Sequence, residues 1–120
     1  MAMKTVGNCM ISPVLSIEQD ENVKNTAEKI YANGVGSLLV TSNENFIGII
    51  TKTDLMVRVL IKNLDAESTQ VAEVMSQPLI SIDASETLDS ARKLLREKSI
   101  RHLAVTRDNK IVGIISIKDL

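Results

Sequence analysis

The alternation of apolar and polar stretches along residues 6–55 predicts one supersecondary unit. Pro13 opens a short apolar strand at 14–17, and a polar turn at 18–21 follows it. Residues 22–33 carry apolar side chains at helical spacing, and Asn33-Gly34 supplies a stop signal. Two further apolar runs, 37–41 and 46–51, flank a short polar turn and predict a hairpin. Residues 55–64 are expected to form a closing helix.

The same pattern occurs a second time. Residues 6–55 align with 71–120 without a gap at a constant spacing of 65, and fourteen of these fifty pairs are identical. Such self-similarity indicates one supersecondary unit used twice. We therefore predict an α/β (α+β) fold of two βαββα-type repeats. The first covers 6–64, a linker covers 65–70, and the second covers 71–120, where its final helix is expected to be cut short.

Composition and charge narrow the function. Fourteen basic and fifteen acidic residues give a net charge of −1 without a long run of one sign, which disfavours binding to duplex DNA or an anionic membrane. No apolar stretch approaches the length of about 20 residues that a membrane span needs. A single cysteine, Cys9, excludes an internal disulfide. We expect a cytoplasmic protein.

Both copies end their last strand with a hydroxyl and a carboxylate three residues apart, Thr51 with Asp54 and Ser116 with Asp119. One interpretation is a capping box at the start of a helix. The other is that the two carboxylates accept hydrogen bonds from the hydroxyls of a ribose. The two roles are compatible.

Other candidate residues are fewer. Gly48 and Gly113 interrupt apolar strands, which indicates either a bulge or tight packing, or the close approach of a ligand to the backbone. Arg101 and His102, at the start of an apolar strand, could meet phosphate oxygens or could simply be solvated. No cluster of His and Cys is present, so we expect neither a metal site nor catalysis.

The doubled pattern Met-x-x-Pro, then a helix, then Gly-h-h-[Ser/Thr]-x-x-Asp-Leu (h, apolar) resembles the cystathionine-β-synthase (CBS) domain over residues 6–120. CBS domains typically occur in tandem pairs called Bateman modules. The resemblance implies two repeats packed through their sheets with pseudo-twofold symmetry. It also implies two clefts for AMP, ADP, ATP or S-adenosylmethionine-type ligands, and no catalytic residues.

The resemblance further assigns residues to each cleft. In the first cleft Asp54 would bind the ribose, backbone groups would meet the adenine, and a cationic pair would face the phosphates; its residues are Thr51, Thr53, Asp54, Leu79, Ile80, Arg101 and His102. The second cleft lacks the cationic pair and is expected to be weaker; its residues are Val14, Leu15, Gly36, Ser37, Ser116, Lys118 and Asp119.

The function implied by the resemblance is a regulatory sensor of an adenine nucleotide or adenosyl ligand. The family also implies a homodimer, through helical faces that include 27–31 or 55–64, and a protein target that responds to the ligand. Two alternatives stay open: a structural dimerisation module with empty clefts, and a nucleic-acid-binding adaptor.

Overall fold

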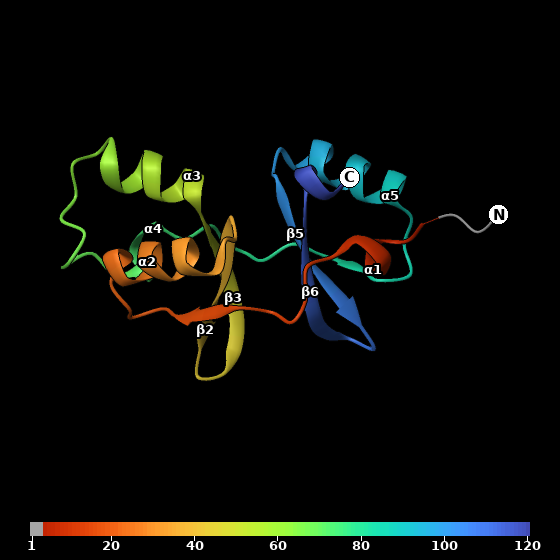
Figure 1. Ribbon diagram of the computed structural model, residues 1–120, viewed down its shortest axis with the longest axis horizontal. Helices are drawn as coiled ribbons and strands as arrows, with labels where there is room; N and C mark the ends of the chain where they lie inside the picture. The colour runs from red at the N-terminus through yellow and green to blue at the C-terminus, as the bar shows by residue number, and fades with distance from the viewer. Residues whose placement is uncertain (1–3) are drawn as a thin grey trace. The chain divides into compact units, whose positions relative to one another are not determined.

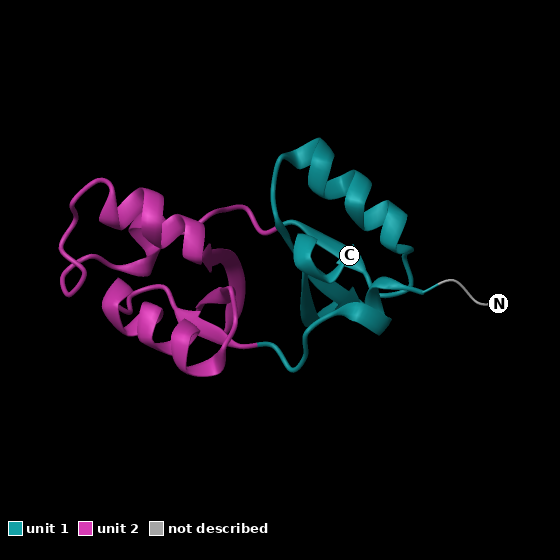
Figure 2. Ribbon diagram, turned by 45° about the horizontal axis from the view of Figure 1, so that its top comes forward, with its two compact units in different colours: residues 1–14, 80–120 teal, residues 15–79 magenta. Residues whose placement is uncertain are grey.

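The computed structural model describes residues 4–120, which form two compact units (Figure 2). Unit 2 is residues 15–79, and unit 1 joins the N-terminal segment up to Val14 with residues 80–120. Each unit has one three-stranded mixed sheet with helices, so the predicted α/β fold is confirmed (Figure 1).

The sheet of unit 2 has the strand order β1-β2-β3. Strand β1 (Ser16–Glu18) is parallel to β2 (Ser37–Ser42), and β2 is antiparallel to β3 (Asn45–Thr51). A parallel pair needs a long crossover connection, which the helix α2 (Val23–Asn33) supplies. The first strand begins two residues later than the predicted 14–17, since the chain at 14–15 only approaches the sheet: the Leu15 carbonyl accepts a hydrogen bond from the Leu39 amide at 3.1 Å.

Helix α2 ends at Asn33 as predicted and begins one residue after the predicted start, because Asn22 is its cap. The Asn22 side chain accepts a hydrogen bond from the Asn25 amide at 2.8 Å and thereby caps the first turn. The helix stops at Gly34, which adopts a left-handed conformation with φ of 64°. Glycine takes this conformation without the steric cost that a side chain adds. The polar turn of the hairpin is also tight: Asn43 and Glu44 both have positive φ, as a type I′ turn requires.

The closing helix of the first copy differs from the prediction of 55–64. It begins earlier, with α3 (Lys52–Asp54), because Thr51 caps that turn, and it continues as the π-helical segment η1 (Leu55–Leu60). The helical segment ends at Leu60, before the predicted 64, and the turn that follows contains Asn63 with a φ of 57°. Asparagine tolerates this left-handed conformation better than most residues.

The sheet of unit 1 repeats this topology with the order β4-β5-β6. Strand β4 is parallel to β5, and β5 is antiparallel to β6. Its elements are β4 (Ser81–Asp83), α5 (Leu88–Lys98), β5 (His102–Arg107), β6 (Lys110–Ser116) and a single 3₁₀ turn, η2 (Ile117–Asp119).

The opening helix of each repeat packs in the unit that holds the sheet of the other repeat. Helix α1 (Val6–Cys9) belongs to unit 1, where the Val6 amide donates to the Glu86 carbonyl at 2.8 Å. Helix α4 (Val71–Val74) belongs to unit 2, where the Val71 amide donates to the Glu21 carbonyl at 2.9 Å. The compact units therefore do not coincide with the sequence repeats.

Each unit has its own aliphatic core between sheet and helices. In unit 2 the fully buried Leu38 and Val40 of β2 pack with Ile50 of β3, with helix residues and with α4. In unit 1, Leu103 and Val105 of β5 hold the equivalent places. Because side chains alternate across a strand, residues two apart in the sequence face the same core.

Candidate functional site

The junction between β3 and α3 holds the first hydroxyl and carboxylate pair. Thr51 Oγ1 accepts a hydrogen bond from the Asp54 amide at 3.1 Å, and Asp54 Oδ2 accepts from the Thr51 amide and hydroxyl, both at 3.0 Å. The capping box expected from the sequence is present. It fixes the orientation of the Asp54 carboxylate, which is only 7% exposed.

The second oxygen of Asp54 has partners outside the cap. Asp54 Oδ1 accepts a hydrogen bond from Ser76 Oγ at 3.1 Å, and Arg58 Nε lies 3.8 Å from the same oxygen. Arg58 also donates to the carbonyls of Val74 and Met75, at 3.1 and 3.0 Å. The carboxylate is therefore tied to the segment that follows α4.

The second copy builds the same junction between β6 and η2. Asp119 Oδ2 accepts from the Ser116 amide at 2.8 Å and from the Ser116 hydroxyl at 3.1 Å. Ser116 Oγ accepts from the Lys118 amide at 3.3 Å. Asp119 is half-buried, so its carboxylate is more accessible than that of Asp54.

Each junction adjoins the start of the second strand of its own copy. Ser37 pairs with Thr51 across the β2–β3 ladder, and the Gly36 carbonyl accepts from the Lys52 amide at 3.1 Å. Residues 101 and 102 occupy the same places in unit 1: His102 pairs with Ser116, and the Arg101 carbonyl accepts from the Ile117 amide at 2.9 Å.

Gly48 and Gly113 are explained by close approach of the protein's own backbone. A Cβ atom at Gly48 would lie 2.6 Å from the carbonyl oxygen of Ser76, and one at Gly113 would lie 2.9 Å from that of Ile11. Real Cβ atoms essentially never come under 3.0 Å, so a side chain at either position forces the neighbouring segment to move. Each ladder also has an irregularity beside its glycine, after Val40 and after Val105. Packing against the chain thus accounts for both glycines.

The residues predicted for each cleft come from both units. In unit 2 lie Thr51, Thr53, Asp54 and Leu79 of the first cleft, and Leu15, Gly36 and Ser37 of the second. In unit 1 lie Ile80, Arg101 and His102 of the first cleft, and Val14, Ser116, Lys118 and Asp119 of the second. Within a unit, the structure brings the junction and strand-entrance residues together. The composition of the two clefts stays a prediction.

Two residues beside Asp54 were not predicted, Ser76 and Arg58. The sequence contains one signal for Ser76. At the spacing of 65 it aligns with Ile11, so the two copies differ at this position. Arg58 lies beyond the aligned residues 6–55, and its reach to Val74 and Met75 depends on how η1 packs on α4.

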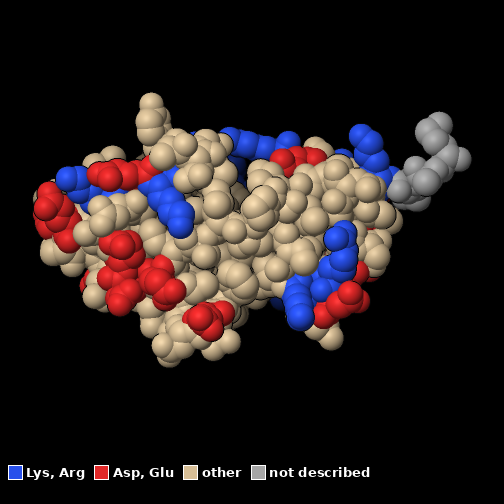
Figure 3. All heavy atoms as spheres, turned by 60° about the horizontal axis from the view of Figure 1, so that its bottom comes forward, with Lys and Arg blue, Asp and Glu red and all other residues tan. Residues whose placement is uncertain are grey.

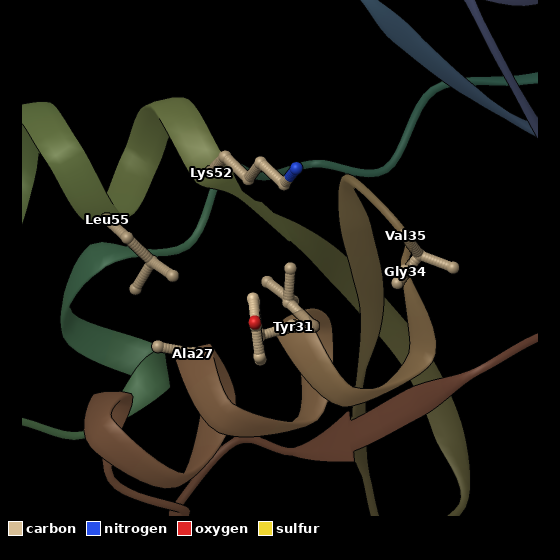
Figure 4. Close-up of a pocket in the computed structure, with 7 residues that line it drawn as sticks. Ala27, Tyr31, Gly34, Val35, Lys52 and Leu55 are labelled. Carbon is tan, nitrogen blue, oxygen red and sulfur yellow. The ribbon is translucent and has the colours of Figure 1, made fainter.

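A hollow of about 430 Å³ lies on the helical side of unit 2, where Lys52 and Leu55, at the two ends of the capped turn, contribute to its lining (Figure 4). Tyr31 stands beside it and is 88% exposed. The lining side chains are mostly apolar, and only Lys52 among them is charged; they are Ala27, Ile30, Tyr31, Gly34, Val35, Lys52 and Leu55. None of the residues predicted for the clefts lines this hollow.

Two other kinds of site find no counterpart in residues 4–120. No three His, Cys, Asp or Glu side chains gather in this part of the chain as metal ligands would. None of the helices that these residues form has the length and apolar character of a membrane span.

Two three-stranded sheets, the doubled motif and the paired capped carboxylates together define a tandem CBS-domain protein. The family model for the CBS domain matches residues 6–61 and 71–120, so the chain belongs to the CBS family. CBS domains are typically non-catalytic.

Individual relatives agree with this assignment. The chain is 30% identical to MK0525 of Methanopyrus kandleri over 122 residues, which is 100% of this chain and 62% of that protein. The solved CBS-domain structure of NE2398 has a TM-score of 0.86 at 32% identity, over 98% of this chain and 94% of that one. A CBS-domain protein of Burkholderia ambifaria MC40-6, for which signal transduction has been suggested, has a TM-score of 0.84 at 27% identity, over 89% and 79% of the two chains.

Proposed function

We propose that this CBS pair is a regulatory sensor that binds an adenine nucleotide or an S-adenosylmethionine-type ligand. The single observation that supports it is the pair of capped carboxylates, Asp54 and Asp119, each held in one orientation at a strand–helix junction. A carboxylate oxygen has more than one acceptor site, so the cap and a ribose hydroxyl can share the same group. A positioned carboxylate loses little entropy when a ligand binds.

Adenine and phosphate recognition would come from other groups. The Ile80 carbonyl already accepts a hydrogen bond from the Ala104 amide at 3.0 Å, so the backbone of Leu79 and the Ile80 amide are the groups proposed to meet the adenine. Arg101 is exposed and is the proposed phosphate contact, together with His102. An arginine can bind phosphate oxygens in a bidentate manner.

The charge of the two units supports a phosphate-bearing ligand near unit 1. Unit 1 has nine Lys or Arg against six Asp or Glu, while unit 2 has five against nine. Figure 3 shows acidic side chains concentrated on the part of the molecule at the left, which is unit 2. A positive field attracts a nucleotide more strongly than it attracts an uncharged nucleoside. This favours AMP, ADP or ATP over methylthioadenosine.

The proposal is tested by calorimetric titration of AMP, ADP, ATP, S-adenosylmethionine and methylthioadenosine. Asp54→Asn and Asp119→Asn keep the side-chain size but remove the charge. Because hydrogen bonds to a charged group contribute about 1.5–3 kcal/mol, each change at an occupied site should weaken binding by at least about tenfold.

Asp65→Asn is the matched control for those two changes. Asp65 also accepts hydrogen bonds from a nearby amide and hydroxyl, those of Ser68 at 3.0 and 2.7 Å, but it lies in an exposed loop. Its substitution should leave affinity unchanged. Binding that survives both Asp54→Asn and Asp119→Asn, or no binding of any of the five ligands, would refute the proposed site.

We also propose that the protein forms a homodimer through the helical side of unit 2. CBS proteins are often oligomeric. The exposed apolar side chains here include Tyr31 at 88%, Leu60 at 74% and Ile61 at 69%. At the spacing of 65, Ala27 and Tyr31 correspond to Arg92 and Arg96, so helix α5 of unit 1 presents charge at the same positions. Helix α2, with apolar side chains at these positions, is therefore a better dimer interface than helix α5.

Light scattering after size exclusion tests the dimer. Tyr31→Arg, which copies Arg96, should shift the protein toward the monomer, whereas Glu97→Arg, an exposed change on helix α5 of unit 1, is the control. An unchanged dimer in Tyr31→Arg would place the interface elsewhere.

A cytoplasmic location remains part of the proposal and agrees with Cys9 as a free thiol.

A second candidate function is a structural dimerisation module with empty clefts. It is favoured by the same apolar side chains and by Asp54, both of whose oxygens already have partners within unit 2. Thermal denaturation separates the two functions, because a ligand at 100 times its dissociation constant adds about 2.7 kcal/mol of stability. The thermal stability of a pure dimerisation module would be the same with and without any adenosyl ligand.

A further inference from the structure

The two capped carboxylates are not equivalent. Asp54 uses Oδ2 in the cap, and its Oδ1 accepts from Ser76 Oγ at 3.1 Å with Arg58 Nε 3.8 Å away. Asp119 also uses Oδ2 in its cap, with Ser116. The difference lies in what reaches the remaining oxygen.

Position 11 in unit 1 corresponds to Ser76 in unit 2, and the backbone is the same at both. The Ile11 amide donates to the Ile114 carbonyl at 2.8 Å, and the Ile114 amide donates back at 3.1 Å. Ser76 exchanges the same two bonds with Ile49, at 2.8 and 3.0 Å. The backbone at this point is therefore held on the last strand in the same way in both units, but isoleucine has no hydroxyl to donate.

We propose that Ser76, supported by Arg58, determines which carboxylate accepts the ribose, and that it favours Asp119 over Asp54. This inference rests on the proposed function. At Asp54 both oxygens already accept hydrogen bonds, and at Oδ1 a ribose hydroxyl must share the carboxylate with the Ser76 hydroxyl, so it gains less than at an oxygen without that partner. Asp119 receives no such competitor from position 11, because isoleucine carries no hydroxyl. This reverses the preference for the first cleft that the cationic pair suggests.

The test is a swap of the two residues, with AMP as the probe in calorimetric titrations. Asp119→Asn isolates the Asp54 site; in that background Ser76→Ala should tighten AMP binding by about tenfold, the value of one hydrogen bond to a charged group. Asp54→Asn isolates the Asp119 site; in that background Ile11→Ser should weaken AMP binding by a similar factor. The single-site proteins should also differ, with the Asp119 site the tighter.

Ser68→Ala is the matched control, because Ser68 also donates its hydroxyl to a carboxylate of unit 2, that of Asp65 at 2.7 Å. It should leave AMP affinity within about twofold, as expected for a surface change. Circular dichroism establishes that every variant is folded, and Ile11→Ser serves as the independent arm if Ser76→Ala is unstable.

The outcomes separate the inference from the function on which it rests. AMP binding that both swaps leave unchanged would overturn the role of Ser76 while keeping the sensor. AMP binding that is tighter at the Asp54 site of Asp119→Asn than at the Asp119 site of Asp54→Asn would overturn the preference for Asp119. Absence of binding of AMP and S-adenosylmethionine in every variant would overturn the proposed function and the inference together.

Discussion

Substitution of Gly48 by alanine should destabilise the protein through one identifiable clash. The added Cβ would lie 2.6 Å from the carbonyl oxygen of Ser76 and 3.1 Å from the sulfur of Met75. The methionine side chain can move, but the carbonyl cannot move freely. It accepts a hydrogen bond from the Ile49 amide at 3.0 Å, and the Ser76 amide donates to the Ile49 carbonyl at 2.8 Å.

The expected loss in the free energy of unfolding is the sum of two costs. Forcing an extra carbon into a well-packed place costs about 1–3 kcal/mol. Weakening the two backbone hydrogen bonds adds about 1 kcal/mol, since an ordinary intramolecular bond contributes about that much. The expected loss of about 2–4 kcal/mol corresponds to a fall in Tm of roughly 10 °C for a protein of this size. Urea denaturation and calorimetry of wild type and variant measure it.

Gly34→Ser provides the matched control. Gly34 has a φ of 64°, and nothing lies within 4 Å of an added Cβ, so strain is the only cost. The corresponding residue of the second copy, Ser99, already adopts a φ of 54° with a side chain. We expect a loss of about 1 kcal/mol, the cost of the left-handed conformation for an ordinary residue. If Gly48→Ala is no more destabilising than Gly34→Ser, the close approach of the Ser76 carbonyl is not what requires glycine.

Two further predictions concern unit 1. Thr87→Ala removes the side chain that accepts from the Ser90 amide at 3.1 Å and caps α5, so the free energy of unfolding should fall by about 1 kcal/mol in urea titrations, whereas Thr87→Asn should restore most of it. Ser85 lowers the pKa of Asp83 below its ordinary value of 3.8, chiefly through its hydroxyl and then through its amide. A lowered pKa stabilises the folded state above the ordinary value, and this contribution is lost as the pH falls through the lowered pKa. Ser85→Ala should therefore lose less stability on acidification than the wild type, and an identical pH dependence of the two would contradict the assignment.

The sequence predicted the elements well because their signals are local. The helical spacing of apolar side chains at 22–33, the stop at Asn33-Gly34 and the polar turn between two apolar runs each act within a few residues, and the second copy supplied an independent reading of the same signals. Errors occurred at the ends of elements. The closing helix begins at Lys52 because Thr51, assigned to the strand, also caps the helix.

What the sequence did not predict depends on contacts between distant residues. The repeat pattern contains the opening helices at 6–9 and 71–74, but nothing in a repeat says whether such a helix packs on its own sheet or on that of the other copy. The hydrogen bond between Ser76 and Asp54 joins residues 22 apart in the sequence and exists only because α4 packs in unit 2.

The exchange of opening helices gives the differences between the two copies a functional meaning. The residues that follow α4 pack on the first sheet. Ser76, which belongs to the second repeat, therefore donates its hydrogen bond to Asp54, which belongs to the first repeat. Ile11 holds the corresponding place in unit 1, where its backbone pairs with Ile114 of β6. A substitution at position 76 or 11 therefore changes the surroundings of one junction and leaves those of the other unchanged. Under the proposed function, two sites built from one repeated motif would in this way acquire different affinities, and a single chain would respond to a ligand over a wider range of concentration than two equal sites allow.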